Sequence, residues 1–254
     1  MNQLELCQFA NRYIQGGDAL PGTAPVTVVG QTGYLYEQIK NVADAYKSIQ
    51  NEQDQWRFMQ KQGSFALPGA TRVLTNADMV VQVPDYETIR ADLFGAGQRY
   101  MQIYADSVGP NNETPVIYVD YQTWRGSIDQ GPIPTCRPYL FTIRPDEAIE
   151  FNSIADQDYH FTCDYQRTLG EFTQVDVGPV LADEQTPIFP ARFHEAIAWR
   201  AVMFWAGSVE ATGKYGFARS EFERIMNDMR NDQLPETVPY YEALYAVNGT
   251  WSYR

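Results

Sequence analysis

The chain has 254 residues, 44% apolar and 20% charged, which is enough for one large or two small globular domains with a sizeable core. Its net charge of −13 disfavours sequence-specific DNA binding, because an acidic protein repels phosphates at long range. Three cysteines at irregular spacing argue against a disulfide framework, and the lack of an 18-residue apolar run argues against a membrane-spanning helix.

The N-terminal part of the chain has helical periodicity. Residues 3–15 carry apolar side chains on one face, and Gly16-Gly17 ends this pattern. In residues 33–54, apolar side chains recur at alternating spacings of four and three, which predicts a long amphipathic helix. Thr32 precedes this segment, and we expect its hydroxyl to cap the helix by accepting a free backbone N–H.

The middle of the chain changes to short β-rich segments that are separated by turn residues. One short helix is expected at Tyr121–Gly126. The expected strands are Ser64–Leu67, Met79–Val83, Arg99–Ala105, Val116–Asp120, Tyr139–Ile143, Ala148–Phe151 and Tyr159–Tyr165. Several short strands at this spacing predict a small antiparallel sandwich or barrel.

Helical spacing returns near the C-terminus. Apolar residues recur on one face after Pro190, and Gly213 separates this pattern from a last helix that ends near Leu234. Residues 236–254 have no sustained period and contain five aromatic side chains, so we expect an extended C-terminal tail.

These patterns predict an α+β fold in which helices from both ends form one bundle. We assign residues 1–62 and 191–235 to the helical bundle, 63–190 to an inserted antiparallel β sandwich or barrel, and 236–254 to the tail. Helices this far apart in sequence can still be neighbours, because the entropic cost of closing a loop grows slowly with its length.

Negative charge is concentrated in the β insertion under these boundaries. Residues 63–190 carry 7 basic and 18 acidic side chains, a net charge of −11. One interpretation is that an exposed insertion needs charge for solubility. The other is that the insertion faces a partner or a passage where negative charge is useful.

The chain offers few residues for catalysis or for binding a cofactor or a metal. In a strand, His160 and Cys163 point to opposite faces, so they cannot share a metal ion. His194 precedes Glu195, but no second histidine completes an HExxH motif, and we expect a satisfied or exposed histidine at a helix start. Gly30–Gly33 lacks the GK[ST] ending of a phosphate-binding loop. We therefore expect no catalytic, cofactor-binding or metal-binding residues.

The order of several segments resembles the head-to-tail adaptor proteins of tailed bacteriophages, especially those of short-tailed phages. The resemblance covers about residues 2–235, and it depends on the order and spacing of the segments together. These segments are Val29–Gly33, Trp56–Phe58, Tyr118–Arg125, Arg137–Pro145 and Phe189–Ile197.

The resemblance implies a structural protein of the virion neck that is assembled in the host cytoplasm. It implies that the protein forms a dodecameric ring under the portal. It implies binding to the portal and to a tail or nozzle protein, with DNA passing through the channel without specific contacts, and it implies neither catalysis nor a cofactor nor membrane binding. It also implies that the C-terminal tail reaches along a portal subunit. The candidate portal-binding residues are Tyr240, Tyr241, Leu244, Tyr245, Trp251 and Tyr253.

Two alternatives remain open from the residues. The chain could be another tail or nozzle protein with a β sandwich, although such a protein would not need a helical bundle. It could also be a glycan-binding module that uses exposed Trp and Tyr side chains of the β insertion. An enzyme is the weakest alternative, because two isolated histidines do not assemble a nucleophile, a base and an orienting group.

Overall fold

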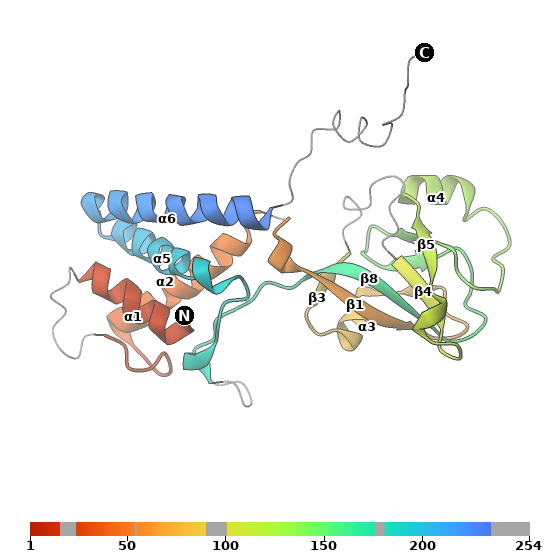
Figure 1. The fold of residues 1–254 in the computed structure, drawn as a ribbon, viewed down its shortest axis with the longest axis horizontal. Helices are drawn as coiled ribbons and strands as arrows, with labels where there is room; N and C mark the ends of the chain where they lie inside the picture. The colour runs from red at the N-terminus through yellow and green to blue at the C-terminus, as the bar shows by residue number, and fades with distance from the viewer. Residues whose placement is uncertain (16–23, 54, 90–100, 176–180, 235–254) are drawn as a thin grey trace, which may run out of the picture. The chain divides into compact units, whose positions relative to one another are not determined.

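The computed structural model describes residues 1–15, 24–53, 55–89, 101–175 and 181–234 (Figure 1). The chain forms two compact units. Residues 59–169 form the β unit, and residues 1–58 together with those from Gly170 onward form the helical unit. Within the described residues, the fold is α+β, with six α-helices and a curled mixed sheet.

The helical unit contains α1 (Gln3–Ile14), α2 (Gly33–Gln50), α5 (Glu195–Ser208) and α6 (Thr212–Gln233), as the sequence periodicity predicts. Helix α5 packs against each of the other three, so it forms the centre of the unit (Figure 1). This position explains why α5 is apolar around most of its circumference. Its buried residues are Ala196, Ile197, Ala198, Trp199, Ala201, Val202, Met203 and Ala206.

The predicted start of α2 is confirmed, but the predicted capping hydrogen bond from Thr32 is wrong. Helix α2 begins directly after Thr32, but the Thr32 side chain makes no capping hydrogen bond. Gly33, the first residue of the helix, has a φ of +60°, a left-handed conformation that favours glycine. By contrast, α1 begins with a capping box, in which Asn2 accepts from the Glu5 N–H and the Glu5 carboxylate accepts from the Asn2 N–H.

Residues 170–175 and 181–190 pack on the helical unit. The Gln50 amide accepts from Gly170 N at 2.7 Å and donates to Gly170 O at 2.9 Å. Tyr46 Oη accepts from Ile188 N at 2.9 Å. In the same segment, the short 3₁₀ helix η4 (Ala182–Glu184) contacts α1. The C-terminal part of the helical unit therefore begins at Gly170, whereas the sequence pattern placed the return to the helical bundle at residue 191.

This boundary changes the distribution of charge. Residues 59–169 carry 8 basic and 14 acidic side chains, a net charge of −6. The rest of the chain carries 11 basic and 18 acidic side chains, a net charge of −7. The contrast between an acidic insertion and a nearly neutral bundle was therefore wrong, since it depended on four acidic residues between 170 and 190 that belong to the helical unit.

The β unit contains a sheet with strand order β1-β8-β4-β5-β6-β7-β2, and β3 pairs with the end of β8. Figure 1 labels β1, β3, β4, β5 and β8 of this sheet. The strands are β1 (Gln60–Leu67), β2 (Val73–Leu74), β3 (Tyr86–Thr88), β4 (Met101–Ala105), β5 (Thr114–Tyr118), β6 (Leu140–Ile143), β7 (Ile149–Phe151) and β8 (Tyr159–Arg167). Strands β5 and β6 are parallel, so the sheet is mixed and the expectation of an antiparallel arrangement is corrected.

One face of the sheet forms the core of the β unit. Alternate residues of β4 and β8 are buried, as are Phe65, Leu67 and Val116 on neighbouring strands. The intervening residues of these strands are polar or half-exposed, as expected of a sheet with one solvated face.

Short elements complete the β unit. The segment Met79–Val83 was predicted as a strand, and this prediction is wrong. Residues 79–82 lie in α3 (Asn76–Gln82), which Thr75 and Asp78 start with a capping box, and Val83 is the extended residue that ends the helix. The predicted short helix is confirmed as α4 (Tyr121–Ser127), capped by Asp120. The remaining 3₁₀ helices of the described chain are η1 (Arg57–Met59), η3 (Pro110–Asn112) and η5 (Ala191–Phe193).

Candidate functional site

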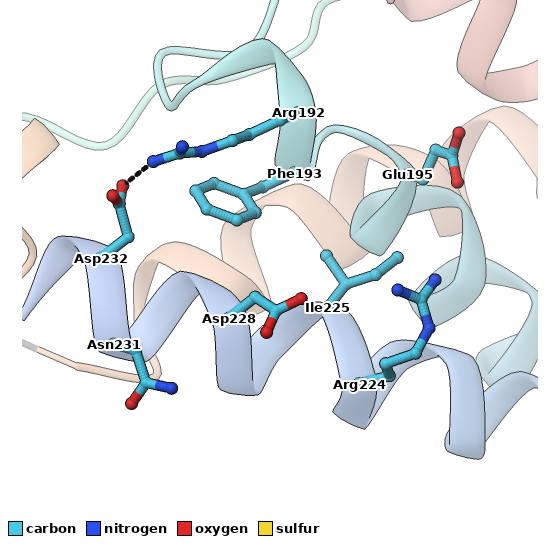
Figure 2. Close-up of a pocket in the computed structure, with 8 residues that line it drawn as sticks. All are labelled: Arg192, Phe193, Glu195, Arg224, Ile225, Asp228, Asn231 and Asp232. Atoms are coloured by element: carbon cyan, nitrogen blue, oxygen red, sulfur yellow. Dashed lines mark ion pairs between the residues drawn. The ribbon is translucent and has the colours of Figure 1, made fainter.

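An open groove of about 640 Å³ lies on the helical unit between η5, the first turn of α5 and the C-terminal half of α6 (Figure 2). Its lining residues are Arg192, Phe193, Glu195, Arg224, Ile225, Asp228, Asn231 and Asp232. The groove therefore combines two guanidinium groups, three carboxylates and one amide with two apolar side chains.

Phe193 and Ile225 supply the apolar part of the groove, and both are buried. The Arg192 guanidinium lies 4.7 Å from the centre of the Phe193 ring and forms an ion pair with Asp232 (Figure 2). The hydrogen bond from Arg192 holds the pKa of the Asp232 carboxyl below its usual value. On this wall of the groove, the Arg192 guanidinium thus stacks on the Phe193 ring and pairs with the Asp232 carboxylate.

Three further charged side chains line the groove between α5 and α6. Arg224 forms an ion pair with Glu221 at 2.9 Å, and its side chain is 59% exposed. Glu195 and Asp228 make no ion pair with any other residue of the described chain. Their carboxylates therefore remain available as hydrogen-bond acceptors.

The groove lies where the chain leaves the last helix. Asp228, Asn231 and Asp232 belong to the final two turns of α6, which ends at Gln233. All six residues predicted to bind a portal, from Tyr240 to Tyr253, lie outside the described residues. The groove is thus the described surface closest along the chain to these residues.

A second surface of the helical unit presents aromatic side chains. The Phe9, Tyr13, Trp199 and Phe217 rings form a continuous series, with centroids 4.3 Å apart for Tyr13 and Trp199 and 5.5 Å apart for Trp199 and Phe217. Phe217 is 55% exposed and Tyr13 is 37% exposed. Clustered exposed aromatics of this kind are typical of protein–protein contact surfaces.

The two histidines lie in different surroundings. His194 is buried, its Nε2 donates to the Phe189 carbonyl at 2.9 Å, and its burial lowers the pKa of the imidazole. This agrees with a satisfied histidine at a helix start. His160 contacts the Asp106 carboxylate and stacks on Tyr104.

Two of the three cysteine thiols are buried, whereas Cys136 is half-buried. Cys7 and Cys163 are buried, and burial raises the pKa of the Cys7 thiol to about 12. Among the residues that the structure describes, no three His, Cys, Asp or Glu side chains come together as a metal-binding group. No helix in this part of the chain is long and apolar enough to cross a membrane.

The sequence did not reveal the groove. Its residues come from two helices and a 3₁₀ turn. Taken singly, each residue has the sequence pattern of an ordinary solvent-facing or core position. The pairing of Arg192 with Asp232 joins residues 40 positions apart, so no local motif marks it.

The family model described as SU10 adaptor protein matches residues 1–240 of the chain. The match includes both compact units and extends six residues past Leu234. No curated protein matches the sequence.

Proposed function

Because the chain belongs to the SU10 adaptor family, and is therefore a structural adaptor protein of a bacteriophage virion, we propose that it forms a ring under the portal. The ring joins the portal to a tail or nozzle protein in the neck of the virion. The observation that carries this proposal is the length of the family match, residues 1–240, which includes both the helical unit and the β unit.

A ring requires a head-to-tail interface, in which two different surfaces of one subunit meet on successive neighbours. The helical unit offers two distinct surfaces of suitable chemistry, namely the aromatic series that ends at Phe217 and the charged groove. Both units carry net negative charge, which suits passage of DNA without binding, whichever unit lines the channel.

The C-terminal segment, residues 236–254, is the proposed clasp on the portal. It contains five aromatic side chains, which supply large contact areas at a small cost in side-chain entropy. The residues proposed to contact the portal are Tyr240, Tyr241, Leu244, Tyr245, Trp251 and Tyr253. Many equivalent contacts around a ring would add through avidity, so each clasp can be weak.

Deletion of residues 236–254 tests the clasp. We expect the shortened chain to bind purified portal at least about tenfold more weakly than the full chain, because the loss of even one anchoring aromatic typically costs more than 1 kcal/mol. The measurement is a portal pull-down over a range of adaptor concentrations. A circular dichroism spectrum of each chain controls for folding. Unchanged affinity would remove the C-terminal segment from the mechanism.

A further inference from the structure

Strand β1 lies beside β8 at one end of the sheet, so its other edge has no neighbouring strand among the described residues (Figure 1). Its eight residues pair with β8 in one unbroken antiparallel register. The strand contains neither a bulge nor a proline, two features that commonly protect an exposed sheet edge. We propose that this edge pairs with the same edge of a second copy of the chain, across a two-fold axis at Gln62.

A contact with α3 identifies the backbone groups that face this edge. The Ala66 N–H donates to Gln82 Oε1 at 2.6 Å, and the Ala66 carbonyl accepts from Gln82 Nε2 at 3.3 Å. Both backbone groups of Ala66 therefore point away from β8. Because the pattern repeats at every second residue of an antiparallel pair, the backbone groups of Gln60, Gln62 and Ser64 point the same way. Those of Gln62 and Ser64 have no hydrogen-bond partner in the part of the chain that the structure describes.

The length of the free edge determines which residues can pair. The Gln82 amide already occupies the edge at Ala66, so the positions left for a second strand end at Ser64. An antiparallel copy centred on Gln62 uses all of these positions. The two Gln62 residues then exchange two backbone hydrogen bonds, and each Ser64 pairs with Gln60 of the other copy. Both copies thus use the same surface, as a two-fold axis requires.

The side chains of β1 also favour this centre. With the axis at Gln62, Lys61 of one copy lies opposite Gly63 of the other, which leaves room for the lysine. A Cβ atom at Gly63 would lie 2.8 Å from the Phe65 ring, so packing in the core favours glycine at this position. An axis one residue earlier would place the two Lys61 ammonium groups opposite each other. An axis one residue later would bring the second strand onto the edge position that Gln82 occupies.

The charge of β1 suits contact between two copies. The chain has a net charge of −13, so two copies repel each other at long range. Strand β1 contains no acidic side chain, and its one charged residue, Lys61, is paired with Asp85 at 2.6 Å. The paired strands therefore place no like charges opposite each other. Because salt screens the long-range repulsion, we expect the association to strengthen at high ionic strength.

The pair of β1 strands is independent of the ring proposed above. A two-fold contact is complete with two copies, whereas a ring needs two different surfaces that meet in succession. The contact includes few residues, so it belongs to the weak class of interfaces and forms at high protein concentration. Each experiment uses the full chain without portal, so failure of the proposed ring cannot produce its result.

Residue-resolved hydrogen exchange by NMR tests whether the edge is paired. The amides of Gln62 and Ser64 should exchange at least about fivefold more slowly at roughly 1 mM than at roughly 20 µM protein. The amides of Lys61 and Gly63 face β8 and should be protected equally at both concentrations. Fast exchange at Gln62 and Ser64 at both concentrations would overturn the proposal. Slow exchange at both would assign the edge to another segment of the same chain, and this result would also overturn it.

A proline substitution tests the role of the Gln62 N–H. Gln62→Pro removes this donor, and proline is tolerated in an edge strand where its nitrogen faces away from the neighbouring strand. The dissociation constant of the dimer, measured by analytical ultracentrifugation, should rise at least about tenfold, because the two central hydrogen bonds are lost. Gln62→Thr is the matched control, since it keeps the N–H, and it should change this constant less than about threefold. Unchanged exchange of the β8 amides shows that each variant is folded, and equal effects of the two substitutions would contradict the pairing.

Two cysteine variants test the register. The Cα atoms of the two Gln62 residues would lie about 5.5 Å apart, within the range of a disulfide, whereas those of the two Ser64 residues would lie about 13 Å apart. Under mild oxidation, Gln62→Cys should therefore form a covalent dimer at least about tenfold faster than Ser64→Cys. The unmodified chain, with Cys7, Cys136 and Cys163, gives the background rate. Equal rates for the two variants would overturn the two-fold axis at Gln62.

Discussion

The helical unit and the β unit differ in how the chain builds them rather than in their charge. The helical unit joins residues 1–58 to residues from Gly170 onward, so its stability depends on contacts between distant segments. The β unit is one continuous segment, 59–169, with its own apolar core. Their net charges, −7 and −6, are almost equal.

The two units also differ in how much of their aromatic surface is buried. In the β unit, the aromatic rings of Phe65, Phe161 and Tyr165 pack on one another within a single core. In the helical unit, part of the aromatic series is exposed, and the charged groove lies at the final turns of α6. We therefore expect substitutions in the β unit to act mainly on its own stability, and substitutions on the helical surface to act also on binding.

The largest effect is expected in the β unit from Arg72→Ala. Arg72 forms ion pairs with Glu150 at 2.7 Å and with Asp129 at 2.9 Å, and Glu150 is only 8% exposed. Removal of the guanidinium leaves a buried carboxylate without its partner, which should lower the free energy of unfolding by about 3 kcal/mol. Urea denaturation measures this loss, and hydrogen exchange should show that it is confined to residues 59–169.

The control for Arg72 is Arg144→Ala in the same unit. Arg144 pairs with Asp146 on the surface, and both side chains are at least one-third exposed. Its loss should cost less than about 1 kcal/mol. If the two substitutions cost the same, the buried pair is not a special feature of the β unit.

A smaller effect is expected in the helical unit from Gly170→Ala. A Cβ atom at this position would lie 2.3 Å from Tyr46 Oη and 3.0 Å from Tyr46 Cζ, in a segment that Gln50 fixes from both sides. We expect a loss of about 1–3 kcal/mol in the free energy of unfolding, with faster amide exchange in α2. The change tests whether the start of the segment 170–190 stabilises the bundle.

Gly216→Ala is the matched control, because a Cβ atom at Gly216 in α6 would meet open space. This substitution should raise the stability by roughly 0.5–1 kcal/mol, since alanine favours a helix over glycine. A loss of stability in both variants would mean that the tight contact at Gly170 is not the cause.

The smallest effect is a pH dependence of the helical unit through His194. Burial lowers the pKa of this imidazole in the folded chain, so the unfolded chain binds the proton more readily. The free energy of unfolding should therefore fall as the pH decreases below about 6.5. His194→Gln should reduce this dependence and leave assembly intact, because the amide can still donate to the Phe189 carbonyl. Urea denaturation of the unmodified and the His194→Gln chains at several pH values measures the pH dependence of the free energy of unfolding. Identical profiles for the two chains would contradict the contribution of His194.

Elements with a strong local signal could be predicted from the sequence. The apolar spacing of α2 and α6 and the short helix at Tyr121 are all found in the structure. The error at Met79–Val83 has a local cause, because Val80 and Val81 favour a strand, whereas the capping box of Thr75 and Asp78 starts a helix. The capping residues were present in the sequence and should have outweighed the two valines.

Other features had no local signal. The segment after Gly170 lacks periodicity, and long-range contacts assign it to the helical unit, namely the hydrogen bonds of Gln50 and Tyr46 and the packing of η4 on α1. The same is true of the groove, because Arg192 and Asp232 meet only after α5 and α6 have packed. The parallel pairing of β5 and β6 likewise depends on the path of the chain between them rather than on their residues.

This adaptor protein is proposed to form a ring on the portal. Electron microscopy of the purified full-length chain, alone and mixed with purified portal, tests it most directly. We expect portal particles to acquire an additional ring of adaptor subunits at one end, whether or not the chain forms such a ring alone. Portal particles that remain bare at saturating adaptor concentration would contradict the proposed ring.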